Sequence, residues 1–229
     1  MVMSGSDGKS VVVVSGGIDS STLLYKAKAD GCDVRALTFL YGQKHSREVR
    51  SAEAVCRSAG VDHLPLDLSA IAPAMSGSAL TDPKVPIPEV PADAEHYSTL
   101  RATVVPNRNA VFLSIAVAYA VTIGARAVLF GAHHSDRGVY PDCRREFVLA
   151  FERAERLAVD DEGFRVEAPF VDMDKADIVK LGVELGVPFE LTWSCYRGGE
   201  LHCGVCSSCR ERKRAFREAG VTDPTRYER

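Results

Sequence analysis

VVVVSGGIDS, at residues 11–20, is the stretch of sequence that decides the fold. Four consecutive valines predict a strand that is buried on both faces of a parallel sheet. Two glycines then allow a sharp turn, and residues 20–30 have the apolar spacing of a helix that ends at Gly31. A strand, a glycine turn and a helix in this order indicate the start of an α/β domain.

The same alternation continues along the chain. We expect further strands at residues 34–40, 63–68, 127–130 and 165–168, and helices at residues 47–59, 107–123, 144–159 and 174–185. Gly60 is expected to end the second helix, and Asp174 is a candidate N-cap for the last one. This pattern predicts a doubly wound, Rossmann-like parallel sheet in one domain over residues 1–190.

Prolines interrupt the alternation between residues 69 and 106. They stand at Pro73, Pro83, Pro86, Pro88, Pro91 and Pro106. Because proline lacks the backbone N–H, this stretch cannot form a long helix or a central strand. A loop of that length in a compact domain is usually functional or mobile.

Composition narrows the class of protein. The chain has 229 residues, of which 46% are hydrophobic and 26% charged, as in an ordinary globular domain. Its net charge of -3 argues against a surface devoted to nucleic-acid phosphates. We expect a cytoplasmic protein, since residues 1–14 do not form a signal peptide. The uncharged residues 109–125 are too few for a membrane span and predict a buried helix.

The turn after the first strand has the features of an anion site. Its backbone N–H groups and the N-terminus of the following helix face the same point, and Ser15, Ser20 and Ser21 add hydroxyl donors. A glycine turn capped by Asp19 or Ser20 is the simpler alternative. The Gly-Lys-Ser/Thr of the Walker motif is missing, which disfavours γ-phosphate transfer by that route.

The pattern SGG-x-DS after a valine strand resembles the pyrophosphate-binding loop of ATP-pyrophosphatase enzymes, which cleave ATP between its α and β phosphates. The resemblance implies that ATP, with Mg²⁺, binds at this junction. The implied ATP-binding residues are Val14, Ser15, Gly16, Gly17, Ile18, Asp19, Ser20, Ser21 and Thr22. Tyr41 and Gln43 follow the second strand, where open α/β sheets bind ligands, and we add them to this set.

A cluster of cysteines near the C-terminus predicts a metal site. Cys195, Cys203, Cys206 and Cys209 have the spacing C-x7-C-x2-C-x2-C, and four thiolates with no open position suit structural Zn²⁺. An iron–sulfur cluster uses the same ligands and stays an alternative. We therefore expect a four-cysteine zinc segment and a helix over residues 191–229, packed on the same domain. A solvated basic face is expected for residues 210–217.

Several segments together resemble one family over nearly the whole chain. They are SGGIDSST at residues 15–22, TFLYGQKH at 38–45, VPNRN at 105–109, YPDCRREF at 140–147 and CYRGGELHCGVCSSCRERKRAF at 195–216. The chain is similar to the 7-cyano-7-deazaguanine synthase family (QueC), whose fold is of the adenine nucleotide alpha-hydrolase type with a four-cysteine zinc site. The resemblance implies a ligase, often a homodimer, that acts on a small molecule.

The implied reaction converts 7-carboxy-7-deazaguanine, ammonia and ATP into the nitrile. Adenylation gives the carboxylate a good leaving group, ammonia forms an amide, and a second activation removes the amide oxygen. We expect Asp19 to act at the reacting centre and Arg108 and Arg144 to hold the carboxylate or the phosphates. Asp142 or Asp136 is expected to accept from the guanine-like face of the base.

Three other activities are compatible with parts of this sequence. The enzyme could stop at the amide or pass the acyl group to another amine. It could thiolate tRNA through a persulfide on Cys143, or it could be a zinc-bearing adaptor that uses residues 210–217. His133 and His134 are candidate acid–base groups, although two histidines on a loop are more often exposed to solvent.

Overall fold

A computed structural model describes residues 8–44, 46–90 and 101–229 of the chain. His45 of the TFLYGQKH segment and residues 91–100 of the predicted loop, Pro91 included, lie outside the described residues. The described sheet has five parallel strands in the order β3-β2-β1-β4-β5. Their bounds are Lys9–Val13 for β1, Asp33–Leu40 for β2, Asp62–Asp67 for β3, Ala127–Leu129 for β4 and Arg165–Glu167 for β5.

Helices alternate with the strands as predicted, and two more α-helices follow β5 in the described residues. They are α1 (Ile18–Ala29), α2 (Arg47–Ala59), α4 (Arg108–Thr122), α5 (Arg145–Val159), α6 (Lys175–Glu184) and α7 (Ser207–Ala219). Gly60 ends α2 in the left-handed conformation at φ 63°. Asp174 is at the N-cap position of α6, but its side chain makes no capping hydrogen bond. Short 3-10 helices cover Ser69–Met75, Arg101–Thr103, His134–Gly138, Pro141–Cys143 and Phe189–Leu191.

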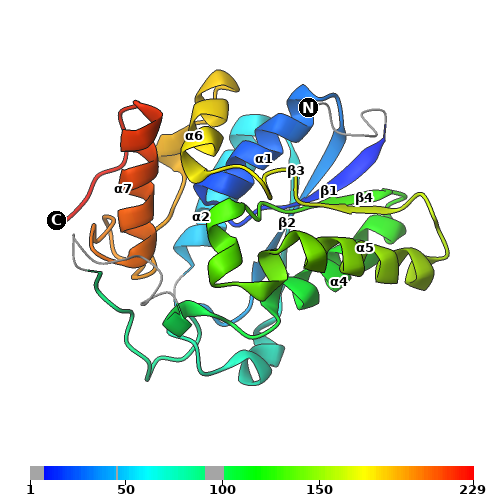
Figure 1. Ribbon diagram of the computed structural model, residues 1–229, viewed down its shortest axis with the longest axis horizontal. Helices are drawn as coiled ribbons and strands as arrows, with labels where there is room; N and C mark the ends of the chain where they lie inside the picture. Colours follow the sequence, from blue (N-terminus) through cyan, green and yellow to red (C-terminus); the bar gives the residue numbers. More distant parts are fainter. Residues whose placement is uncertain (1–7, 45, 91–100) are drawn as a thin grey trace.

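The sheet is covered on both faces, so the doubly wound α/β prediction is confirmed. Successive residues of a strand point to opposite faces. Val12 and Val14 therefore pack with α1, α2 and α6, and Val11 packs with α4. Figure 1 shows α1 and α6 on one side of the sheet and α4 and α5 on the other. Burying each such valine contributes about 1.5–3 kcal/mol, which explains the run of four.

The apolar helix α4 lies on the second face of the sheet. Phe112, Leu113 and Ala116 are among its buried side chains, and its opposite side is exposed. The helical stretch Arg101–Thr122 is long and apolar enough to cross a membrane by length and composition alone. Its buried side chains belong to the same cluster as Val11 and Leu37 of the central strands, which is the packing of a core helix.

The C-terminal segment packs on this domain. Ala215 and Phe216 of α7 belong to the cluster around Val12 and Val14, and α7 stands beside α6 in Figure 1. A separate small cluster contains Trp193, Val205 and the four cysteines of the predicted metal site. The proline-rich stretch reaches this segment, because the N–H of Val90 donates to the carbonyl of Val205 at 2.9 Å.

One residue of the basic run contradicts the expected solvated face. Arg212 is fully buried, and its guanidinium donates to Asp223 Oδ1 at 3.1 Å, Thr192 Oγ1 at 2.7 Å and the Phe189 carbonyl at 3.1 Å. Because α7 packs against the domain, one position per turn must point inward. A buried guanidinium is tolerated only when its donors are satisfied, and Arg212 meets that condition.

Candidate active site

The carboxyl ends of the central strands open into a cavity of about 250 Å³. It lies where the strand order reverses, with β2 on one side of β1 and β4 on the other, the position at which open α/β sheets bind ligands. Side chains and backbone from many parts of the chain line it. They include Ser15, Gly17, Asp19 and Ser20 after β1, Tyr41 after β2, Glu48 on α2, Arg108 on α4, His133 and Asp136 after β4, Tyr140, Lys175 on α6, Tyr196, and Glu211 on α7.

The loop after β1 is braced by its own hydroxyls. Ser15 N donates to Ser20 Oγ at 3.1 Å, and the two serine hydroxyls lie 3.1 Å apart. Gly17 is the N-cap of α1 and has no side chain with which to cap the helix. The first-turn N–H groups of α1 are thus open to an acceptor in the cavity, and this arrangement fits phosphate.

The two glycines of the loop have different tasks. Gly17 lines the cavity, whereas Gly16 faces α2 and does not. Gly16 has φ +81°, and a Cβ there would lie 2.5 Å from the Glu48 carbonyl oxygen and 2.6 Å from Ala52 N. The sharp turn predicted here is present, and the close neighbour of Gly16 is helix α2 of the same chain.

Other predicted loop residues divide in the same way. Val14 and Ile18 line the cavity. Ser21 and Thr22 are fully buried on the core side of α1 and do not line it, and the Thr22 hydroxyl lies against Gly182 of α6. The first part of the loop therefore lines the cavity, and the hydroxyls of Ser21 and Thr22 lie in the core instead.

A buried ionic cluster joins the loop to the C-terminal helices. Lys175 Nζ lies 3.1 Å from Asp19 Oδ2 and 2.6 Å from Glu211 Oε2. Burial alone would lower the pKa of Lys175, but the two carboxylates outweigh it and raise that pKa above its usual range. Lys175 is therefore a fixed cation next to the phosphate loop. Neither Lys175 nor Glu211 was predicted, since nothing in their local sequence marks them.

His133 belongs to this cluster too. Its Nε2 lies 3.5 Å from Asp136 Oδ2 and 3.8 Å from Asp19 Oδ2, and the side chain is 2% exposed. The expectation that both histidines face solvent is wrong for His133, because the chain turns inward after β4. His134 is exposed as expected.

The other half of the cavity combines a guanidinium with tyrosines. Arg108, the first residue of α4, contacts the Tyr41 hydroxyl and lies near Tyr140. The Tyr140 hydroxyl pairs with Thr103 Oγ1 at 2.9 Å, and the Tyr41 ring packs edge-on against Phe112 at 5.0 Å. This half offers apolar ring faces and one fixed positive charge, which suit a flat acidic ligand.

Glu48 faces the same cavity from α2. Burial raises the pKa of its carboxyl to about 7, and the positive charge of Arg108 offsets only part of that effect. A carboxyl with such a pKa changes its protonation state near neutral pH. Glu48 was not predicted as a site residue, because a glutamate in the first turn of a helix is common.

The remaining predicted residues have local structural contacts. Gln43 braces the end of β2, because its Oε1 accepts from Tyr41 N at 2.7 Å and its Nε2 donates to the Phe39 carbonyl at 3.2 Å. Asp142 Oδ2 accepts from Asn109 N at 2.9 Å near the start of α4. Arg144 is exposed and donates to the Arg137 carbonyl. Gln43 lines the cavity, whereas Asp142 and Arg144 do not.

Cys143 is a buried thiol at the edge of the cavity. Burial raises its pKa well above the usual range, and Asn109 Nδ2 lies 3.1 Å from its sulfur. Nucleophilic cysteines need an accessible thiolate with a lowered pKa. The environment of Cys143 therefore disfavours the thiolation alternative.

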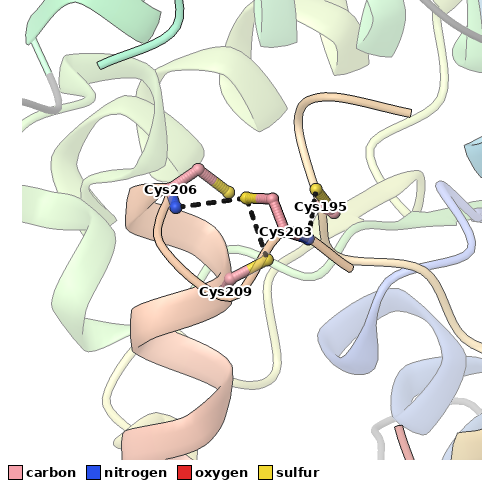
Figure 2. A group of neighbouring side chains, drawn as sticks. All are labelled: Cys195, Cys203, Cys206 and Cys209. Atoms are coloured by element: carbon pink, nitrogen blue, oxygen red, sulfur yellow. Dashed lines mark hydrogen bonds between the residues drawn. The ribbon is translucent and has the colours of Figure 1, made fainter. Parts of the chain in front are cut away.

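The four cysteines converge as the spacing predicted. All four are buried, and their sulfurs lie within 4.8 Å of one another (Figure 2). A tetrahedral ion with metal–sulfur bonds of about 2.3 Å needs sulfur–sulfur separations of about 3.8 Å, and Cys203 and Cys209 are 3.9 Å apart. The N–H groups of Arg197 and Cys203 each lie 3.4 Å from Cys195 Sγ, as expected around thiolates. These residues fit a metal.

The cysteine segment also forms part of the cavity wall. Ser194 and Tyr196, on either side of Cys195, both line the cavity. Trp193 N donates to the Gly16 carbonyl at 2.8 Å, and its indole donates to the Cys195 carbonyl at 2.7 Å. His202 Nε2 accepts from Ser194 N at 3.0 Å, which makes it a structural neighbour of the cluster. The cysteine cluster and the loop after β1 are thus joined by a few residues.

The fold and site define a class: the sheet and phosphate loop are those of the adenine nucleotide alpha-hydrolase type, with a four-cysteine cluster added. Solved structures with this fold include an NMN synthetase from Francisella tularensis, with a TM-score of 0.51 and 14% identity, covering 93% of this chain and 84% of that one. A 4-thiouridine synthetase in complex with RNA and bound ATP has a TM-score of 0.54 and 16% identity, covering 94% and 51%. At these identities the likeness is one of fold alone.

The sequence defines the family. The family of the queuosine biosynthesis protein QueC matches residues 9–220, and the chain belongs to it. It is 54% identical to a 7-cyano-7-deazaguanine synthase of Archaeoglobus fulgidus, over 94% of this chain and 89% of that one. It is 50% identical to a 7-cyano-7-deazaguanine synthase of Caldicellulosiruptor bescii, over 96% and 97%. The family resemblance drawn from the motifs is confirmed.

Proposed function

We propose that this chain is a ligase that converts 7-carboxy-7-deazaguanine and ammonia to 7-cyano-7-deazaguanine with ATP. The supporting observation is that one and the same cavity has a phosphate loop and Lys175 on one side and Arg108 with tyrosines on the other. Such a cavity holds a nucleotide and a flat acidic base next to each other. The names of its relatives support the choice of base and product.

Roles of the chain's own residues follow from this placement. The α1 N-terminus and Lys175 hold phosphates, and Asp19 orients Lys175 through their 3.1 Å contact. Arg108 holds the substrate carboxylate, and the rings of Tyr41 and Tyr140 contact the base. ATP with Mg²⁺ supplies the adenylyl group that makes the carboxylate oxygen a leaving group. After amide formation the same contacts serve a second activation, and loss of that oxygen gives the nitrile.

A product assay tests the proposal. The purified protein is incubated with ATP, the deazaguanine acid and ammonium, while pyrophosphate release is followed and the product is weighed by mass spectrometry. We expect pyrophosphate and the nitrile. An amide that persists with excess ATP would show that the chain stops at the first product, and no pyrophosphate at all would reject adenylation.

We further propose Zn²⁺ at the four cysteines, a cytoplasmic homodimer, and action on the small molecule without nucleic acid. The buried cluster of sulfurs supports a structural ion, and elemental analysis distinguishes zinc from iron. Support for a dimer comes from the exposed apolar side chains of Val121 on α4 and Leu149 and Leu157 on α5. Light scattering measures the oligomer directly.

A further inference from the structure

One cavity carboxylate has no assigned task. Four acidic side chains line the cavity, and three of them are engaged: Asp19 and Glu211 with Lys175, and Asp136 with His133. Within the described ranges, Glu48 has neither a hydrogen bond nor an ion pair at its carboxylate. An acceptor that faces a cavity without a partner is suited to a cationic or N–H-donating ligand.

The place of Glu48 narrows the choice of ligand. Its helical turn packs against Gly16 of the phosphate loop, and the positive charge of Arg108 acts on its carboxyl. If Arg108 holds the substrate carboxylate, Glu48 faces that same end of the substrate. The N1–H and 2-amino donors of a deazaguanine lie on the six-membered ring, and only its pyrrole N–H shares the five-membered ring that carries the carboxylate. The ligand of Glu48 is then at the reacting carbon rather than at the far edge of the base.

We propose that Glu48 is a catalytic residue that binds the ammonium ion and accepts its proton during amide formation. This inference rests on the proposed function, in which ammonia attacks an adenylated carboxylate. At neutral pH ammonia is mostly ammonium, which has no lone pair and cannot attack. An unpaired carboxylate at the reacting carbon attracts the cation and supplies a base at the required position.

The step balances with the groups named. Glu48 takes one proton from ammonium, and the freed lone pair forms the C–N bond to the acyl carbon. The C–O bond to AMP then breaks and AMP leaves with the electron pair. The nitrogen loses a second proton to solvent, which gives the neutral amide. No oxidant or reductant is involved.

The test separates adenylation from amide formation. Glu48→Gln keeps the size of the side chain and removes the base, and Glu53→Gln, on the same helix but exposed and paired with Arg57 at 2.6 Å, is the control. ATP–pyrophosphate exchange without ammonia measures adenylation. We expect E48Q to keep this exchange within about threefold and to lose amide formation by about 10²–10⁴-fold, the range for general base removal. E53Q should match the wild type in both.

Hydroxylamine provides the deciding comparison. It is largely unprotonated at neutral pH and needs neither capture as a cation nor deprotonation before attack, so E48Q should still form the hydroxamate at near wild-type rate. Loss of exchange and of hydroxamate in step with the amide, in a variant that melts like the wild type, would overturn the proposal and assign Glu48 to base recognition. Unchanged amide formation would overturn it as well.

If E48Q fails to fold, Glu48→Asp answers the same question, because it keeps the negative charge but shortens the side chain by one methylene. Amide formation should then fall while exchange persists, and equal retention of both rates would contradict the proposal. A wild-type enzyme without exchange on the deazaguanine acid would instead reject the proposed function. The two failures are therefore distinguishable.

Discussion

Gly16→Ala tests the account of the phosphate loop most directly. The residue has φ +81°, where an L-amino acid costs about 1–2 kcal/mol. Its Cβ would lie 2.5 Å from the Glu48 carbonyl oxygen and 2.6 Å from Ala52 N. Both atoms are helix backbone that cannot rotate away, so overpacking adds about 1–3 kcal/mol. We expect the free energy of unfolding to fall by about 2–5 kcal/mol in total.

Gly60→Ala is the matched control. Gly60 has φ +63°, and a Cβ there would meet nothing within 4 Å. It therefore carries the backbone cost without the steric one, and the entropy that alanine removes from the unfolded chain is the same at both sites. Urea denaturation at constant metal content measures the difference, which should be about 1–3 kcal/mol. If G16A is as stable as G60A, the packing of Gly16 against α2 is not what requires glycine.

The same two variants also test the role of the loop in activity. Pushing Gly16 away from α2 displaces its neighbours Ser15 and Gly17, which line the cavity. ATP–pyrophosphate exchange should fall in Gly16→Ala and stay near wild type in Gly60→Ala. Loss of exchange in both variants would point to a general loss of stability instead.

Further predictions concern the buried charges and the metal. Arg212→Met should lower the free energy of unfolding by about 3–5 kcal/mol, because it leaves the mostly buried Asp223 carboxylate without its positive partner, with only the Thr225 N–H and the Tyr227 hydroxyl as donors. The exposed Arg214→Met should change it by less than about 0.5 kcal/mol in the same urea experiment. Lys175→Met should raise the KM for ATP by about 10–100-fold, since a charge-assisted hydrogen bond is worth about 1.5–3 kcal/mol. The exposed Lys180→Met should leave that KM unchanged. Chelation of the metal should shift the emission of the sole tryptophan of the chain, Trp193, and added zinc should restore it, whereas an unchanged spectrum would contradict the link between the cluster and the cavity wall.

The fold followed closely from local sequence. Every predicted strand and helix is present, with ends within two residues of the expected ones. Buried parallel strands are continuous apolar runs, as in the four valines of β1, and glycines such as Gly60 mark helix ends because few other residues adopt positive φ. The strand ends shifted slightly because hydrogen bonding across the sheet, rather than side-chain pattern, decides where strand pairing stops.

The site was predictable where its residues are neighbours in sequence. The phosphate loop and the cysteine cluster are each formed by a short stretch of the chain. The spacing of their residues in the sequence is therefore enough to predict their geometry. Lys175, Glu211 and Glu48 come from three helices, and each stands in an ordinary helical context. These three residues come together only because their helices meet at the cavity in the folded protein.

The sequence by itself determined the class of fold, the glycine loop after β1, the four-sulfur cluster and the family, because each follows from short local patterns in the chain. Tertiary structure decided which of the candidate side chains line the cavity. It turned Asp142 to the start of α4, buried Arg212 on the inward face of α7 and assigned Gly16 to helix packing. The physical reason is that burial, charge pairing and close approach are properties of several segments at once, and these come together only when the chain folds.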